Sequence, residues 1–162
     1  MTERPVYAAV CGAGEASADV AAQAETVGRA LARAGAVVVC GGHGGVMAAA
    51  ARGAAAEGGI VVGFLPGGDR TAGNPYLTVA IPTGMGEMRN ALIVRAADSI
   101  VAVGGEFGTL SEIALALKAG KPVIGLGTWR LARDDGSAVD ALIRVDSPEE
   151  AARRALDPGL RD

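Results

Sequence analysis

The chain has 162 residues, of which 50% are hydrophobic, 20% are charged and 3% are aromatic, and its formal net charge is −3. This length fits one domain, residues 1–162, and the composition is typical of a packed globular protein rather than a disordered or nucleic-acid-binding one. Two cysteines are too few for a disulfide framework, no signal-peptide pattern opens the chain, and no apolar run is long enough to cross a membrane. We therefore expect a cytoplasmic protein that has neither nucleic acid nor a membrane as a partner.

Short β-branched runs alternate with longer alanine-rich segments along the chain. In chain order they predict a strand at 6–11, a helix at 18–34, a strand at 37–40, a helix at 46–57, a strand at 60–65, a loop at 69–75, a strand at 77–81, a helix at 86–97, a strand at 99–103, a helix at 109–118, strands at 123–126 and 143–145, and a last helix after the N-cap Ser147. Pro148 suits the first position of that last helix. Residues 158–162 are expected to form a frayed tail.

The alternation of apolar strands with helices predicts an α/β fold of one domain. Continuous apolar strands are typical of a parallel sheet that is covered on both faces. Right-handed crossovers then give a Rossmann-like, doubly wound sheet with helices on both faces. Such folds bind ligands outside the carboxyl ends of their strands. The glycine clusters of this sequence lie at those ends.

The first glycine cluster, Gly12-Ala13-Gly14, does not match a dinucleotide fingerprint. Its third glycine would stand at position 17, which is Ser17, and the second strand ends in Cys40 and glycines instead of an acidic residue. Both departures argue against NAD binding. Gly120-Lys121 is followed by proline and precedes a strand, so it is not a nucleotide-binding P-loop.

The segment 104–112, Gly-Gly-Glu-Phe-Gly-Thr-Leu-Ser-Glu, leaves a predicted strand and opens a helix. Backbone N–H groups and the helix dipole at such a turn can receive a phosphate or another anion, with Gly105, Gly108 and Thr109 as the contacts. The alternative is a tight turn in which glycine only relieves steric strain. Gly41, Gly42 and Gly45 form a second turn of the same kind, and two such turns favour a ligand site.

Two charged residues are candidates for the chemistry of that site. Glu112 lies in the first turn of its helix, where it either complements the helix dipole or faces the anion site as a functional carboxylate. Arg89 follows the glycine-rich loop that contains Met85, and a guanidinium there suits a phosphate. His43, the single histidine, is interpreted as a polar loop residue, with a catalytic or ligand-contacting role as the alternative.

The cysteines Cys11 and Cys40 end neighbouring predicted strands. Small buried core residues are the favoured interpretation, and a reactive or metal-binding thiol pair is the alternative. Their spacing does not match a zinc site, and the sequence predicts no metal site.

These motifs resemble those of the Lonely Guy (LOG) proteins, which were once misannotated as lysine decarboxylases. Arg89-Asn90 and the segment 104–112 match the family's Arg-Lys pair and its Pro-Gly-Gly-x-Gly-Thr-x-x-Glu motif at the same separation. Cys11-Gly12 and residues 41–47 match two earlier family segments, so the resemblance covers residues 6 to about 126. It implies a nucleoside 5′-monophosphate phosphoribohydrolase with Arg89 and Glu112 as its catalytic pair, and not a lysine decarboxylase.

The departures from the LOG pattern resemble a branch that includes molybdenum cofactor carrier proteins. Asn90 replaces the family's lysine, Gly104 its proline and Glu106 its second glycine. The favoured hypothesis is therefore a non-catalytic binder of a phosphorylated nucleotide-like or pterin ligand, and the phosphoribohydrolase is the alternative. Glu106 would repel a free monophosphate unless its side chain points away or pairs with Arg89.

The resemblance also implies the site residues and the assembly. No cofactor is required, although molybdenum cofactor or a nucleoside monophosphate is the expected ligand, and a homodimer or homotetramer is expected. The residues expected to bind the ligand are Gly12, Gly41, Gly42, Gly45, Met85, Asn90, Gly105, Gly108 and Thr109.

Overall fold

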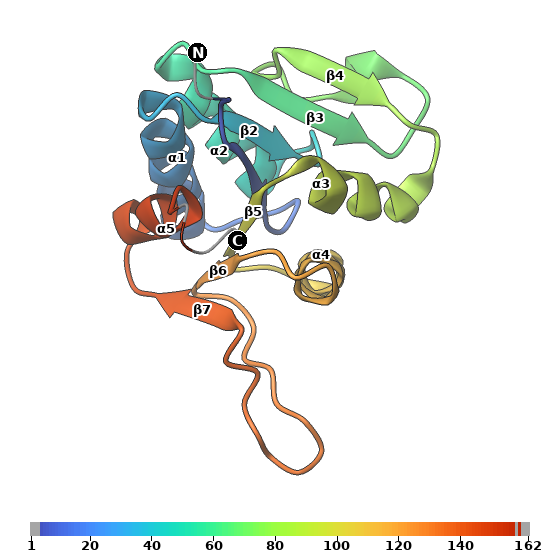
Figure 1. Cartoon of the computed structure of the whole chain (residues 1–162). Helices are drawn as coiled ribbons and strands as arrows, with labels where there is room; N and C mark the ends of the chain where they lie inside the picture. Colours follow the sequence, from blue (N-terminus) through green and yellow to red (C-terminus); the bar gives the residue numbers. More distant parts are fainter. Residues whose placement is uncertain (1–3, 158, 160–162) are drawn as a thin grey trace.

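Seven parallel strands form one sheet in the order β4-β3-β2-β1-β5-β6-β7 (Figure 1). The computed structural model describes residues 4–157 and 159, so most of the predicted tail at 158–162 lies outside the described residues. The strands are β1 (Tyr7–Cys11), β2 (Val37–Cys40), β3 (Val61–Leu65), β4 (Val79–Pro82), β5 (Ser99–Val103), β6 (Val123–Leu126) and β7 (Leu142–Val145).

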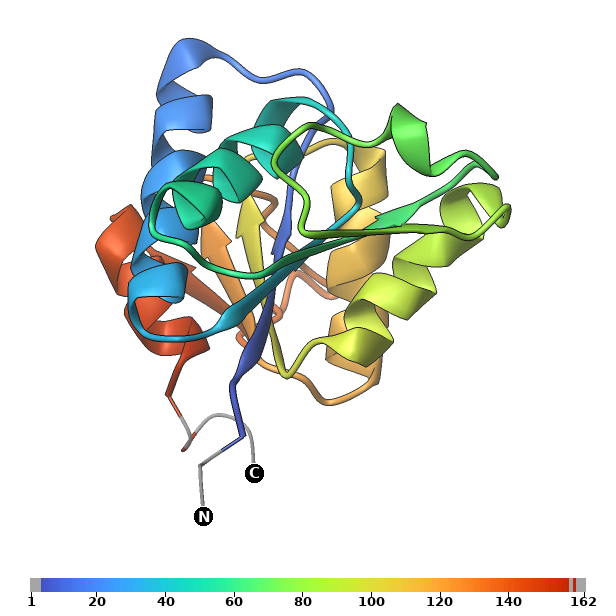
Figure 2. The same cartoon turned by 90° about the horizontal axis from the view of Figure 1, so that it is seen from above.

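The helices cover both faces of this sheet (Figure 2). One face carries α1 (Ala18–Arg33), α2 (Gly45–Ala56) and α5 (Pro148–Ala155), and the other carries α3 (Asn90–Ala96) and α4 (Phe107–Lys118). Each face has its own core of valine, isoleucine, leucine and alanine. The predicted Rossmann-like α/β fold is thereby confirmed. No helix in the described part of the chain is long and apolar enough to span a membrane.

Glycines allow α1 and α2 to pack closely. A Cβ atom on Gly28 would lie 2.0 Å from the carbonyl oxygen of Ala50, and one on Gly53 would lie 2.1 Å from that of Glu25. Larger side chains at these two positions would push the helices apart. At the end of the chain, Ser147 caps α5 as predicted, because its Oγ accepts a hydrogen bond of 3.2 Å from the backbone N–H of Glu150.

Two predicted segments differ from the structure. The predicted helix 86–97 begins as the 3₁₀ turn η2 (Gly86–Arg89), and α3 follows from Asn90. Gly84 and Gly86 have φ angles of +63° and +58°, which a right-handed helix cannot include. The predicted loop 69–75 contains a short 3₁₀ turn, η1 (Arg70–Ala72), which the Asp69 side chain caps by accepting from the backbone N–H of Thr71.

The order of the strands fixes where a ligand can bind. From β1 the chain winds outward through β2, β3 and β4, and it then crosses back to place β5 on the other side of β1. The carboxyl ends of β1 and β5 therefore flank the point at which the winding reverses. Doubly wound sheets open a crevice at this point.

Candidate functional site

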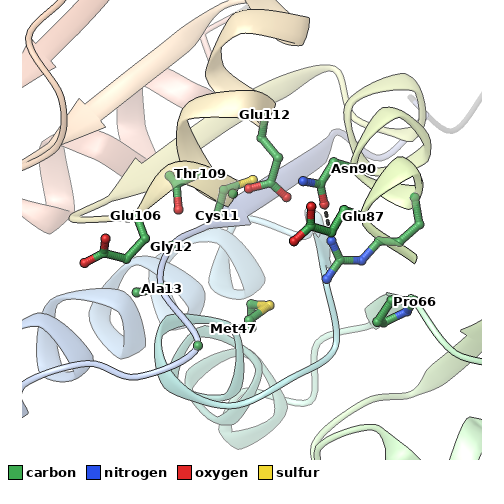
Figure 3. A pocket seen from close by; sticks show the side chains of 13 residues that line it. Cys11, Gly12, Ala13, Met47, Pro66, Glu87, Asn90, Glu106, Thr109 and Glu112 are labelled. Carbon is green, nitrogen blue, oxygen red and sulfur yellow. Dashed lines mark hydrogen bonds between the residues drawn. The ribbon is translucent and has the colours of Figure 1, made fainter. Parts of the chain in front are cut away.

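A cavity of about 310 Å³ lies beyond the carboxyl ends of β1 and β5. It is surrounded by the turns after these strands, the first turn of α4, the first turns of α2 and the η2–α3 junction (Figure 3). The residues that line it are Cys11, Gly12, Ala13, Gly14, Met47, Pro66, Glu87, Arg89, Asn90, Glu106, Gly108, Thr109 and Glu112.

The amino terminus of α4 forms one wall of the cavity. Its N-cap position is Glu106, whose side chain makes no capping hydrogen bond, so no side chain competes for the first N–H groups of the helix. Gly105 has a φ of +117°, and a Cβ atom there would lie 2.6 Å from the Thr109 side chain. Glycine at 105 is thus required for Thr109 to take its buried place in the first turn. The geometry suits an anion at Gly108 and Thr109.

Arg89 is fixed by a chain of hydrogen bonds. Its Nε donates to the backbone oxygen of Phe64 at 3.0 Å, and its Nη1 donates to Oδ1 of Asn90. The Asn90 Nδ2 donates to Ser111 Oγ at 2.9 Å, and Ser111 donates in turn to the backbone oxygen of Gly108 at 2.7 Å. Asn90 is buried, whereas Ser111 is exposed. The chain of hydrogen bonds couples the position of the guanidinium to the first turn of α4.

Glu112 and Cys11 meet at the inner end of the cavity, where both are buried. Burial raises the pKa of Glu112 from 4.5 to about 7, although a hydrogen bond from the Cys11 thiol and the charge of Arg89 both act to lower it. Burial, together with the Glu112 carboxylate, raises the pKa of the Cys11 thiol well above 9.0. The cavity therefore contains a carboxyl group that changes charge near neutral pH and a thiol that remains protonated there.

Six of the residues predicted for the site line one cavity. The structure brings together Gly12, Arg89, Asn90, Gly108, Thr109 and Glu112. Gly105 lies just outside the lining and makes room for Thr109. Gly41 also lies outside it, but a Cβ atom there would stand 2.9 Å from Nη2 of Arg89. Its missing side chain thus leaves space for the guanidinium.

The other predicted ligand contacts do not line the cavity. Gly42, with a φ of +78°, faces the Leu65 side chain, and a Cβ atom on Gly45 would lie 2.2 Å from the backbone oxygen of Ala13. These two glycines shape the β2–α2 turn without reaching the cavity. Met85 is exposed in the loop before η2 and does not line the cavity either. Gly84 and Gly86, which flank Met85, both have positive φ angles, and these angles set the course of the loop that carries Met85.

The histidine and the cysteine pair do not form a second site. His43 does not line the cavity, and its backbone oxygen accepts a hydrogen bond of 3.0 Å from Asn74. Cys11 and Cys40 belong to the cores on opposite faces of the sheet, and both are free thiols. Within residues 4–157 and 159, no group of three or more His, Cys, Asp or Glu side chains is arranged to hold a metal ion.

Sequence reasoning missed several residues of the cavity. Glu87, Met47 and Pro66 line it but were not predicted, and only the position of Glu87 two residues before Arg89 could have drawn attention to it. The sequence left open whether the Glu106 side chain points away from a bound phosphate or pairs with Arg89. Its exposed carboxylate lies at the outer end of the cavity, and it makes no ion pair with Arg89 in the part of the chain described (Figure 3).

Comparison with known proteins gives strong matches over nearly the whole chain. The model of the SLOG cluster4 family matches residues 5–152. A protein of Archaeoglobus fulgidus is 38% identical over 152 residues, which are 94% of this chain and 95% of the relative.

Two solved structures combine a similar fold with a similar sequence. The molybdenum cofactor binding protein of Rippkaea orientalis has a TM-score of 0.84 and 34% identity, over 94% of this chain and 96% of that one. The Moco carrier protein of Chlamydomonas reinhardtii has a TM-score of 0.81 and 30% identity, over 94% of this chain and 98% of that one.

Proposed function

The chain belongs to the SLOG cluster4 family, and from this membership we propose that it is a binding protein for a phosphorylated nucleotide-like or pterin ligand. A carrier of molybdenum cofactor is the specific form of this proposal. The similar structures from Rippkaea orientalis and Chlamydomonas reinhardtii, a cofactor-binding and a cofactor-carrier protein, support it. The ligand is cargo in this role, and the protein needs no resident cofactor to bind it.

The uncapped amino terminus of α4 is the observation on which the proposal depends most. It places the N–H groups around Gly108 and the Thr109 hydroxyl at one wall of a cavity that also holds the Arg89 guanidinium. A helix amino terminus and a nearby arginine are the groups with which proteins hold phosphate. Because Glu106 extends toward solvent at the outer end, the inner part of this wall remains open to an anion (Figure 3).

The proposal is tested by direct binding. Molybdenum cofactor released from a molybdoenzyme is mixed with the protein, and the molybdenum that co-elutes with the protein in gel filtration is measured; AMP is titrated separately by calorimetry. Thr109→Val should weaken both by about tenfold, which is the loss expected for one hydrogen bond to a charged group. Thr26→Val is the matched control, because Thr26 lies on α1 and its hydroxyl donates to the backbone of Ala22. If neither ligand binds the wild-type protein, the proposal is wrong.

A second candidate function, hydrolysis of a nucleoside 5′-monophosphate to a free base and ribose 5-phosphate, is favoured by one observation. Glu112 and Arg89 line the same cavity, and the Glu112 carboxyl has a pKa of about 7. A carboxylate can stabilise a developing sugar cation, and a fixed guanidinium can stabilise the negative charge that develops on the leaving base. Release of free adenine from AMP would test this alternative.

A further inference from the structure

The cavity contains more carboxylates than an anion site requires. Arg89 is the only arginine or lysine in its lining, whereas Glu87, Glu106 and Glu112 all line it. Figure 3 shows Glu106 beside Gly12, Ala13 and Thr109 at one end of the cavity, and Glu87 beside Asn90 at the other end. At the α4 end the free N–H groups of the helix offset the charge of Glu106, whose exposed carboxylate extends outward. The lining thus suits a ligand with one anionic group at the α4 end and an uncharged part beside Glu87.

Glu87 has acceptors to offer to such a ligand. Its exposed side chain projects from η2 toward Glu112 and the middle of the cavity (Figure 3). Arg89 does not neutralise it, because no ion pair joins the two in the described part of the chain, and the Nε and Nη1 of Arg89 already donate to Phe64 and Asn90. The two oxygens of Glu87 are therefore available to N–H donors of a bound molecule.

The surroundings of Glu87 suit a flat ring. Met47 and Pro66 supply apolar surface across the cavity from Glu112 (Figure 3). The Arg89 guanidinium lies near the Met47 sulfur, because a Cβ atom on Gly41 would stand 2.8 Å from Met47 Sδ and 2.9 Å from Arg89 Nη2. Arginine planes and thioether side chains both pack well against aromatic faces. A heterocycle can thus lie between these groups with its polar edge toward Glu87.

We propose that Glu87 selects ligands whose ring carries two adjacent N–H donors, as in the 2-amino-4-oxopyrimidine ring shared by guanine and pterins. This inference rests on the proposed function, because the phosphate at α4 sets the direction in which the ring lies. Two adjacent donors match the two oxygens of a carboxylate, in the same way that a guanidinium does. The corresponding edge of adenine has one amino group beside an unprotonated ring nitrogen, and that nitrogen would face a carboxylate oxygen without a proton between them.

The experiment compares four phosphorylated probes by calorimetry. GMP carries both donors, IMP lacks the 2-amino group, AMP lacks the paired donors, and neopterin monophosphate carries the same edge on a pterin. The wild-type protein should bind GMP about tenfold or more tightly than IMP or AMP, since one lost hydrogen bond to a charged group has about this effect. Whichever of GMP and neopterin monophosphate binds more tightly indicates whether the natural ring is a purine or a pterin.

Glu87→Gln is the decisive variant. Its amide keeps one acceptor and turns an amino group toward the ring's donors, so the affinity for GMP and for neopterin monophosphate should fall about tenfold. The affinity for AMP should stay within about twofold, because AMP makes no paired contact with the carboxylate. Glu149→Gln, in the exposed first turn of α5, is the matched control and should change none of these affinities.

The outcomes separate this inference from the proposed function. Equal binding of all four probes, unaltered in Glu87→Gln, would overturn the inference and leave the proposed phosphate-ligand function intact. Guanosine and adenosine test the reverse case. Binding of guanosine in preference to adenosine, without any gain from the 5′-phosphate, would overturn the proposed function and support the role of Glu87. Binding of none of the six compounds would overturn the inference, and it would overturn the proposed function as well if molybdenum cofactor also fails to bind.

Discussion

The Cys11 thiol faces the Glu112 carboxyl at the inner end of the cavity, where both side chains are buried. The thiol stabilises the charged form of Glu112, but burial outweighs this effect and the pKa of Glu112 rises from 4.5 to about 7. The cavity is therefore less negatively charged below neutral pH than above it.

The first prediction concerns stability against pH. Between about pH 4.5 and pH 7 the folded protein holds a proton on Glu112 that the unfolded chain releases, so the free energy of unfolding should fall as pH rises through this window. The difference is on the order of 3 kcal/mol, from the conversion of pKa shifts to free energy. Urea unfolding at pH 5 and pH 8 measures it.

Glu112→Gln should remove most of this pH dependence, because the amide carries no titrating proton. His43→Gln is the control, because it replaces the one histidine of the chain at a position that does not line the cavity. If the wild type and Glu112→Gln show the same pH dependence, the burial argument for Glu112 is wrong.

The second prediction concerns Gly105. Alanine at this position would place its Cβ atom 2.6 Å from the Thr109 side chain, on a backbone with a φ of +117°. Gly105→Ala should lower the free energy of unfolding by about 1–3 kcal/mol and weaken the binding of phosphate-bearing ligands, because the first turn of α4 must shift. Thermal unfolding and calorimetry measure the two effects.

Gly67→Ala is the control for Gly105, because a Cβ atom on Gly67 would meet nothing within 4 Å and its φ is not positive. Unchanged ligand affinity in Gly105→Ala would show that the turn is not the anion site.

The third prediction concerns the link between Arg89 and α4. Asn90→Ala removes both the acceptor for Arg89 and the donor to Ser111. The Arg89 guanidinium is then no longer held in place, so ligand binding should weaken by about tenfold, the loss expected for one hydrogen bond to a charged group. Ser111→Ala keeps the contact between Asn90 and Arg89, so its effect should be smaller. If Ser111→Ala weakens binding more than Asn90→Ala, the hydrogen-bond chain does not act by holding Arg89.

Most of the fold could be predicted from the sequence because its signals are local. Buried β-branched runs and alanine-rich segments predicted the bounds of nearly every strand and helix to within two residues. The family motifs pointed to the LOG-like proteins and their molybdenum cofactor carrier branch, which the comparisons confirm.

The exception among the predicted elements was the start of α3, where Gly84 and Gly86 adopt positive φ angles that depend on the surrounding turn. The arm 127–141, which extends from the sheet between β6 and β7 (Figure 1), carries no periodic pattern.

The candidate site was predictable only where a motif marks it. Arg89, Glu112 and Thr109 belong to motifs, and they do reach one cavity. Glu87 and Met47 reach it because of the direction of a 3₁₀ turn and the packing of α2, which are set by contacts far along the chain. The same tertiary packing keeps Gly42 outside the cavity, although it belongs to a cluster that resembles an anion-binding turn.

The fourth prediction concerns assembly. An apolar groove lies between the η2–α3 segment and α4, lined in part by Met88, Ala91, Ala114 and Leu115, and Met88 is 70% exposed. We expect this face to form a two-fold contact in a homodimer or homotetramer, because exposed apolar surface of this kind favours association. Light scattering at micromolar concentration should give a multiple of the chain mass, and Met88→Lys with Leu115→Lys should give the monomer. A monomeric wild type would contradict the prediction.

The last prediction concerns catalysis and decides between the two candidate functions. If the protein releases adenine from AMP, Arg89→Ala and Glu112→Gln should each lower the rate by roughly two orders of magnitude, as other preorganised electrostatic groups do. The double variant should be little slower than either single one, because a sugar cation and a leaving base are stabilised in the same transition state. Chromatographic measurement of free adenine is the assay, and rates in both single variants equal to that of the wild type would exclude both residues from catalysis. If the protein is only a binder, the wild type should release no adenine above the buffer blank, while Arg89→Ala should still weaken ligand binding, because the guanidinium holds the ligand whether or not a bond is broken.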